Sequence, residues 1–199
     1  DANPGDEIID LHASRAGRTV LIAEQLRGDG LLIANYRTHS ARDRIVQGLH
    51  DNIPEAMRLA VRLTNHECDS WPTGEVRSVH KVLLDAPCTK EKELLEAGQP
   101  DFMHGWRDSQ TKRTAKQQLQ MLVNAMRLIT KGGTVVYATR SLSPLENDGD
   151  VLKALAKCPE LEIDILRKEQ FDAHVLGVVN ALVPCLEETD GGYMMLPDR

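Results

Sequence analysis

A cysteine that directly follows a proline, just past an apolar run, is the first group in this chain that could do chemistry. The run from Lys81 to Asp85 is typical of a buried strand, and Ala86-Pro87-Cys88 follows it. Proline fixes its own φ at about −65°, so this turn is rigid enough to aim a thiol at the rim of a sheet. Cys88 is therefore a candidate nucleophile and Asp85 a candidate positioning group. Taken without further motifs, the two residues would be interpreted as a small buried apolar residue and a strand-end cap.

Short apolar runs that alternate with longer helical patterns are expected to position these groups. Six runs have the length and composition of strands: Glu7 to Leu11, Leu31 to Asn35, Arg58 to Leu63, Lys81 to Asp85, Thr134 to Tyr137 and Glu162 to Leu166. The alternation predicts an α/β fold with a mostly parallel, doubly wound sheet. In such sheets ligands bind outside the carboxyl ends of the strands, where Asp85 and Cys88 stand.

The clearest helix is predicted from Thr111 to Thr130, and Lys131-Gly132-Gly133 is expected to end it. Its buried face is marked by residues at three- and four-residue steps: Leu119, Leu122, Met126 and Ile129. Further along, Val175 to Pro184 and Gly192 to Leu196 flank an acidic turn. We expect these two segments to form an antiparallel closing pair.

Composition and charge narrow the class of protein. The 199 residues are 41% hydrophobic, which suits one domain spanning residues 1–199. The net charge of -6 excludes a global positive field of the kind that steers basic RNA binders, so RNA contacts would be local. The four cysteines form no zinc-ligand spacing, and we expect no metal and a reducing compartment. We also expect no membrane span, and no basic presequence opens the chain at Asp1, so any targeting segment would lie upstream.

Five motifs follow one another in order between Lys81 and Val151. They read Val82-Leu83-Leu84-Asp85-Ala86-Pro87-Cys88, Trp106, Gln118-Leu119-Gln120, Gly132-Gly133 and Ser141-Leu142-Ser143-Pro144-Leu145-Glu146-Asn147. Together they resemble the Sun-type, RsmB-like family of RNA 5-methylcytosine methyltransferases. Further similarity, to the branch that modifies mitochondrial ribosomal RNA and pairs with an mTERF-repeat protein, lies in Ile53-Pro54-Glu55, Thr64 to Trp71 and Gly192-Tyr193. The resemblance implies a Rossmann-like class I AdoMet methyltransferase fold.

The chain departs from the family pattern at the nucleophile. In the family, a cysteine in a Thr-Cys-Ser segment after the fifth strand attacks carbon 6 of cytosine. This sequence has Thr139-Arg140-Ser141 there, and a guanidinium, which stays protonated, cannot attack as a nucleophile. The resemblance gives Cys88 a role in product release, and a nucleophilic role for Cys88 is the alternative. Arg140 is expected to plug the pocket or to contact an RNA phosphate rather than to lie fully in solvent.

The loop that would hold the methyl donor also departs from the pattern. The family's Asp-Leu-Cys-Ala-Ala-Pro-Gly-Gly-Lys-Thr appears as Asp10 to Thr19, with Ala16 in place of one glycine, and the Cβ of Ala16 is expected to restrict close approach to the donor's tail. Tyr36 replaces the acid that would accept both ribose hydroxyls. The resemblance implies a vestigial AdoMet site made of Gly17, Arg18, Glu67 and Asp85.

Lys112, Arg113 and Lys116 lie at helical spacing beside the expected substrate loop, where the family meets RNA. We expect them to bind RNA together with Arg140, with a solvated helix face as the alternative. A tryptophan such as Trp71 could stack on a base or pack under a loop.

Loss of the nucleophile, the glycine and the ribose acid predicts a methyltransferase-like protein that no longer methylates. The resemblance implies a role in mitochondrial ribosome assembly in the matrix, with ribosomal RNA and an mTERF-like protein or other assembly factors as partners and without a working cofactor. One alternative is an active AdoMet-dependent ribosomal RNA cytosine-C5 methyltransferase that uses Cys88. Another is retention of AdoMet as a structural ligand without turnover.

Overall fold

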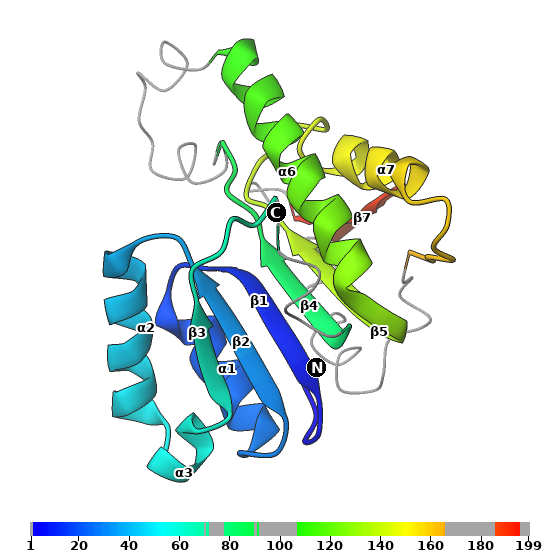
Figure 1. The fold of residues 1–199 in the computed structure, drawn as a ribbon. Helices are drawn as coiled ribbons and strands as arrows, with labels where there is room; N and C mark the ends of the chain where they lie inside the picture. The colour runs from blue at the N-terminus through cyan, green and yellow to red at the C-terminus, as the bar shows by residue number, and fades with distance from the viewer. Residues whose placement is uncertain are drawn as a thin grey trace. The chain divides into compact units, whose positions relative to one another are not determined.

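The computed structural model describes residues 2–69, 71, 78–89, 91, 107–165 and 186–195. The helices in these ranges are α1 (Ala16–Leu26), α2 (His39–Asn52), α3 (Glu55–Arg58), α6 (Asp108–Leu128) and α7 (Asp148–Lys157), drawn in Figure 1. The strands are β1 (Glu7–Ala13), β2 (Leu31–Tyr36), β3 (Val61–Thr64), β4 (Val79–Asp85), β5 (Ile129–Ala138), β6 (Leu186–Thr189) and β7 (Gly192–Met195).

Five strands form one sheet in the order β3-β2-β1-β4-β5, and all four pairings are parallel. The runs Ile8 to Leu11 and Leu32 to Asn35 are buried throughout, as expected of central strands covered on both faces. The chain order reverses between β1 and β4, which lie side by side in Figure 1. Because ligands bind at such a switch point, outside the carboxyl ends of the strands, the candidate site is expected after Ala13 and Asp85. The predicted mostly parallel α/β sheet is confirmed.

Helices α1 and α2 pack together and cover part of this sheet. Thr38 caps α2, since its Oγ1 accepts a hydrogen bond of 3.1 Å from the Ala41 backbone N–H. The tight return from α1 to β2 requires Gly30, which has a φ of +117° and where a Cβ would stand 2.3 Å from the Asp6 carbonyl oxygen. The core cluster of this region comprises Ala2, Ile8, Ala13, Ala23, Leu26, Leu32, Ala34, Ile45, Leu49 and Ile53.

Several predicted boundaries are wrong. The third strand is shorter than Arg58 to Leu63, because Arg58 ends α3 and β3 begins at Val61. Helix α6 ends at Leu128, and Ile129 and Thr130 already belong to β5. The pairing register of β5 shifts between Ile129 and Thr134, around Gly132 with its φ of +77°. Gly132 therefore lies in a bulge inside β5. The prediction had placed it in a turn between the helix and the strand.

The predictions for the last third of the sequence are partly wrong. Residues 162–165 form no strand. An antiparallel pair does form, but its first strand is β6, which contains Glu187 and Glu188 from the expected acidic turn. The pair makes a two-stranded sheet of its own. The segment Val175 to Pro184, predicted as the first closing strand, lies outside the described residues.

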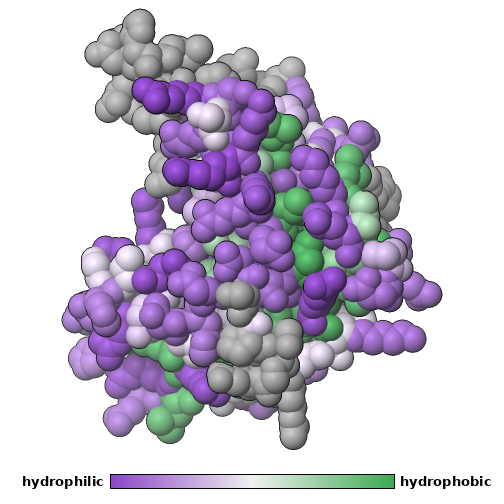
Figure 2. All heavy atoms as spheres, turned by 45° about the horizontal axis from the view of Figure 1, so that its top comes forward, coloured by the Kyte–Doolittle hydropathy of each residue, from purple (hydrophilic) through white to green (hydrophobic). Residues whose placement is uncertain are grey.

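The chain divides into two compact units, so the single domain over 1–199 stays a prediction. Unit 1 comprises Asp1–Pro87 and Gln120–Ala138 and contains the five-stranded sheet, and unit 2 comprises Cys88–Leu119 and Thr139–Arg199. No helix in the described ranges combines the length and apolarity that a membrane crossing needs. The face shown in Figure 2 carries mainly hydrophilic residues, with hydrophobic ones in smaller patches between them.

Candidate functional site

Asp10, in β1 of unit 1, is a buried acid at the expected cofactor loop. Its side chain is 2% exposed, and Oδ1 finds no hydrogen-bond partner among the described residues. Burial raises the pKa of Asp10 to about 7, although the nearby Arg18 guanidinium opposes this shift. Burial also lowers the pKa of the neighbouring His12. Asp10 can therefore accept a hydrogen bond from a ligand in either protonation state.

The first turn of α1 holds the predicted cofactor residues Gly17 and Arg18. Arg18 forms an ion pair with Asp85, so the structure brings two predicted site residues together across the β1–β4 switch point. Gly17 is exposed, and a Cβ built on it would meet nothing within 4 Å. The Cβ of Ala16 lies against α2, since a Cβ built on Gly48 would come within 2.2 Å of it. The methyl group of Ala16 thus packs between the two helices.

The carboxyl end of β2 carries a polar network that the sequence did not indicate. The buried Asn35 amide donates to the carbonyl oxygens of Leu11 and His66 at 3.1 and 3.0 Å. Its Oδ1 accepts from Thr64 Oγ1 at 3.0 Å and from the His66 backbone N–H at 2.8 Å. This amide therefore joins the ends of β1, β2 and β3. The adjoining Tyr36, half-buried, packs on the core cluster where an acid was expected.

Glu67, the predicted adenosine-side acid, is exposed and forms an ion pair with Arg37. Cys68 beside it is buried and donates to the Leu11 carbonyl oxygen at 3.0 Å. Burial raises the pKa of Cys68 to about 11, so this thiol stays protonated near neutral pH. Trp71 is buried with its ring 4.9 Å from that of His66. Trp71 therefore packs in the interior and does not present its ring to a base. Trp106 lies outside the described residues.

In unit 2, the Pro-Cys motif and the Thr-Arg-Ser segment meet. The Arg140 backbone N–H donates to Cys88 Sγ at 3.3 Å, although 52 residues separate the two positions in the chain. Cys88 and Arg140 are both half-buried, so Arg140 is not a fully solvated side chain. Its segment is held by Thr139, whose Oγ1 donates to Asn147 Oδ1 at 2.6 Å. The structure therefore places residue 140, where the family has its attacking cysteine, beside the thiol of Cys88.

Glu146 is the centre of a buried network that joins two of the motifs with Thr89, the residue that follows the Pro-Cys motif. The side chain is completely buried and accepts from the Gln118 amide at 2.9 Å and from the Thr89 backbone N–H at 3.1 Å. The Thr89 hydroxyl lies within hydrogen-bond distance of the carboxylates of Glu146 and Glu91 and donates its one proton to either of them, and it lies 3.2 Å from Ser141 Oγ. Glu91 joins through Thr89. Burial acts to raise the pKa of Glu91, but hydrogen bonds from Thr89 and Ser141 outweigh it and hold that pKa below its usual value.

The predicted RNA-binding residues Lys112, Arg113 and Lys116 are exposed on the first half of α6. Lys112 forms an ion pair of 2.6 Å with Asp108, one turn earlier. Their contact with RNA stays a prediction. In the part of the chain that the structure describes, no group of three or more His, Cys, Asp or Glu side chains could hold a metal ion.

The family model described as "16S rRNA methyltransferase RsmB/F" matches residues 1–196. The chain belongs to this family. The predicted recognition, on five motifs in order, is confirmed.

Curated relatives agree with this assignment. The chain is 31% identical over 157 residues to the 5-cytosine rRNA methyltransferase NSUN4 of Xenopus laevis. The aligned residues cover 78% of this chain and 38% of the relative. It is 29% identical over 171 residues to the mitochondrial tRNA (cytosine(34)-C(5))-methyltransferase of Danio rerio, with 85% and 46% covered. The chain therefore spans less than half the length of these relatives.

Solved structures confirm the predicted class I AdoMet methyltransferase fold. A methyltransferase homolog protein from Pyrococcus horikoshii matches with a TM-score of 0.63 and 26% identity, over 78% of this chain and 46% of that one. NSun6 from Pyrococcus horikoshii with SFG matches with a TM-score of 0.65 and 27% identity, over 76% and 37%.

Proposed function

We propose that this chain is a methyltransferase-like RNA- or protein-binding factor that no longer methylates, and that it acts in mitochondrial ribosome assembly. The observation that carries the proposal is the position of residue 140. The resemblance assigns the attacking cysteine of the family to this position, but the residue here is an arginine. Its backbone N–H contacts Cys88. A guanidinium stays protonated and has no lone pair to offer carbon 6 of a base. The same group can bind an RNA phosphate through charge-assisted hydrogen bonds.

The residues expected to hold AdoMet fit it poorly. Tyr36 presents a phenol where two ribose hydroxyls need a carboxylate, and its ring is committed to the core cluster. Glu67 is paired with Arg37, and Asp85 is paired with Arg18. A bound donor would therefore have to compete with two arginines of the same chain.

The proposed setting follows the relatives. NSUN4 is a 5-cytosine rRNA methyltransferase, and the Danio rerio relative is mitochondrial. We propose ribosomal RNA as the nucleic-acid partner, an mTERF-like protein or another assembly factor as the protein partner, and the mitochondrial matrix as the compartment. A negatively charged chain that binds RNA through local basic groups needs such a protein partner to hold it in place.

The test removes the protein from cells and maps 5-methylcytosine in mitochondrial ribosomal RNA by bisulfite sequencing, with ribosomal subunits followed on sucrose gradients. We expect the methylation pattern to stay unchanged while subunit assembly falls. A Cys88→Ala protein should then restore assembly as well as the natural one. The proposal is wrong if a defined 5-methylcytosine disappears on removal and returns with the natural protein but not with Cys88→Ala.

A second function is favoured by one contact. The Arg140 backbone N–H donates to Cys88 Sγ at 3.3 Å and so holds this candidate nucleophile in place. Among the described residues, no group donates to Oδ1 of Asp10, so this oxygen can accept a hydrogen bond from a bound methyl donor. Under this second proposal, Cys88 attacks carbon 6 of cytosine and the chain is an active RNA cytosine-5 methyltransferase. Transfer of a labelled methyl group to RNA in vitro, lost in Cys88→Ala, distinguishes it from the first.

A further inference from the structure

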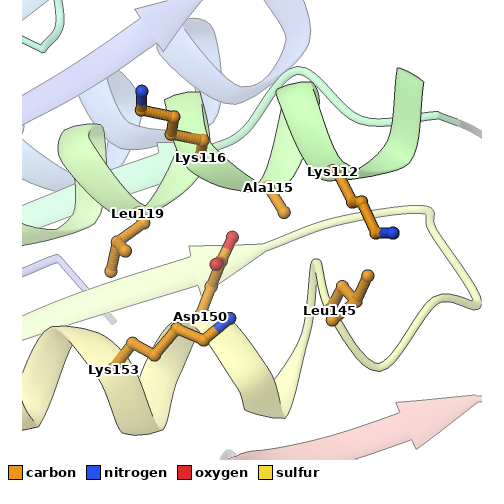
Figure 3. A pocket seen from close by; sticks show the side chains of 7 residues that line it. All are labelled: Lys112, Ala115, Lys116, Leu119, Leu145, Asp150 and Lys153. Atoms are coloured by element: carbon orange, nitrogen blue, oxygen red, sulfur yellow. The ribbon is translucent and has the colours of Figure 1, made fainter. Parts of the chain in front are cut away.

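Unit 2 contains a pocket of about 240 Å³ between α6 and α7 that the proposed function has not used. It is lined by Lys112, Ala115, Lys116, Leu119, Leu145, Asp150 and Lys153. Figure 3 shows residues of α6 along one side, and Leu145 with the first turns of α7 along the other. Pockets for whole drug-sized ligands measure roughly 300 to 1,000 Å³, so this one suits a single group of a larger molecule.

Asp150 lies at the base of this pocket as an acceptor without a donor. Its side chain is 1% exposed, and Oδ2 makes no hydrogen bond with any residue the structure describes. The carboxylate points from α7 towards α6 in Figure 3. A buried polar oxygen that is left unpaired is unfavourable. A ligand that supplies a neutral N–H donor would relieve this deficit.

The rim of the pocket has the opposite charge. Lys112, Lys116 and Lys153 are all exposed, and only Lys112 has an ion pair within the described ranges, with Asp108. Basic side chains along the rim and a carboxylate within the pocket favour a ligand that is anionic outside and a neutral donor inside. An arginine or lysine of a protein partner would satisfy Asp150 but be repelled by the rim, whereas an acidic side chain would be repelled by Asp150.

A nucleotide has both properties in one molecule. Its phosphates are anionic, and the amino group of cytosine, adenine or guanine is a neutral N–H donor that a carboxylate accepts. The faces of a base are apolar and suit walls made of Ala115, Leu119 and Leu145.

We propose that this pocket binds one amino-bearing base of a single-stranded RNA, with Asp150 Oδ2 accepting from the base and the three lysines contacting the flanking phosphates. The proposal rests on the proposed RNA-binding function and deepens it, because it gives that function a base preference. Uracil fits less well, since it presents carbonyl oxygens where the other bases carry the amino group.

The experiment measures binding of fluorescein-labelled RNA hexamers of cytidine, adenosine or uridine by fluorescence anisotropy, at several salt concentrations. The natural protein should bind the cytidine and adenosine hexamers about tenfold more tightly than the uridine hexamer, as one hydrogen bond to a buried carboxylate implies. In Asp150→Asn the preference should vanish or reverse, because an amide can donate to a uracil oxygen. Thermal melting of each variant checks that it folds.

Two lysines on α7 provide a matched pair. Lys153→Ala should weaken all hexamers alike and lower the slope of log K against log salt by about one, since it removes one phosphate contact. Lys157, exposed one turn further along α7, does not line the pocket, and Lys157→Ala should leave that slope unchanged.

The proposal is overturned if Asp150→Asn keeps the base preference of the natural protein, or if no hexamer binds. Binding of a long ribosomal RNA fragment, measured in parallel, separates these failures. If that fragment binds and the hexamers show no Asp150-dependent preference, the pocket assignment is wrong and the RNA-binding function stands. If neither binds, the RNA-binding part of the proposed function is wrong as well.

Discussion

Truncation of Glu146 to alanine should lower the stability of the protein strongly, because this side chain connects segments that are distant in sequence. Glu146 is fully buried and accepts hydrogen bonds from the Gln118 amide, the Thr89 backbone N–H and the Thr89 hydroxyl. Alanine removes the carboxylate that accepts from the amide of Gln118, which is itself fully buried. Thr89 is half-buried and can turn to water.

The size of the effect follows from these contacts. Hydrogen bonds to a charged group contribute roughly 1.5–3 kcal/mol each. Removal of a buried charge offsets part of this, so we expect a loss of about 3 kcal/mol in the free energy of unfolding for Glu146→Ala. For a chain of this length that corresponds to a fall in Tm of roughly 6 to 12 °C. Glu146→Gln keeps one acceptor oxygen and should lose about half as much.

The assay is urea unfolding followed by circular dichroism, with Tm measured in parallel. Glu162→Ala serves as the control, because Glu162 is an exposed acid of the same unit and its truncation should change stability by less than about 0.5 kcal/mol. If Glu146→Ala unfolds within about 1 kcal/mol of the natural protein, the buried network does not hold the motifs together and the reasoning fails.

Three further predictions concern Asp10, Asn35 and the cysteines. Burial raises the pKa of Asp10 to about 7, so the folded protein binds more protons than the unfolded chain between about pH 4 and pH 7, and stability falls as pH rises through that window. Asp10→Asn should remove part of this slope and be more stable than the natural protein at pH 8, by on the order of 2 kcal/mol; equal urea midpoints at pH 8 would contradict this. Asn35→Asp should lower stability by about 3 kcal/mol, because a carboxylate would face the two carbonyl oxygens that Asn35 now donates to; an unchanged Tm would show that the network is dispensable. Iodoacetamide at pH 8 should alkylate Cys88 before Cys68, whose pKa is raised to about 11 by burial, and peptide mass spectrometry that finds equal labelling would refute the difference.

The sheet could be predicted because its central strands are continuous apolar runs. Residues 8–11 and 32–35 are buried throughout, as are Val82, Leu84 and Asp85 in β4, and the apolar composition of these runs is visible in the sequence. The antiparallel pair was placed wrongly because β6 carries Glu187 and Glu188, which are typical of a turn. A short strand that pairs with one neighbour carries too little apolar pattern to be found in a single sequence.

The candidate site was predicted in part. Motif order indicated Cys88 and Arg140, and the structure brings them together. The partners of Glu146 and the unpaired oxygen of Asp150 depend on contacts between distant segments, which one sequence does not reveal. In the sequence, Asp150 is indistinguishable from an ordinary acid in the first turn of a helix. The obstruction expected from Ala16 depended on where its Cβ points, and that Cβ packs against Gly48.

Calorimetric titration with AdoMet tests most directly whether this chain has lost its cofactor and with it the methyl transfer. The natural protein should show no binding up to concentrations on the order of 1 mM. A Tyr36→Asp, Arg37→Ala variant restores an acid at the end of β2 and releases Glu67, so it should bind detectably. One-to-one binding by the natural protein at micromolar AdoMet would contradict the account.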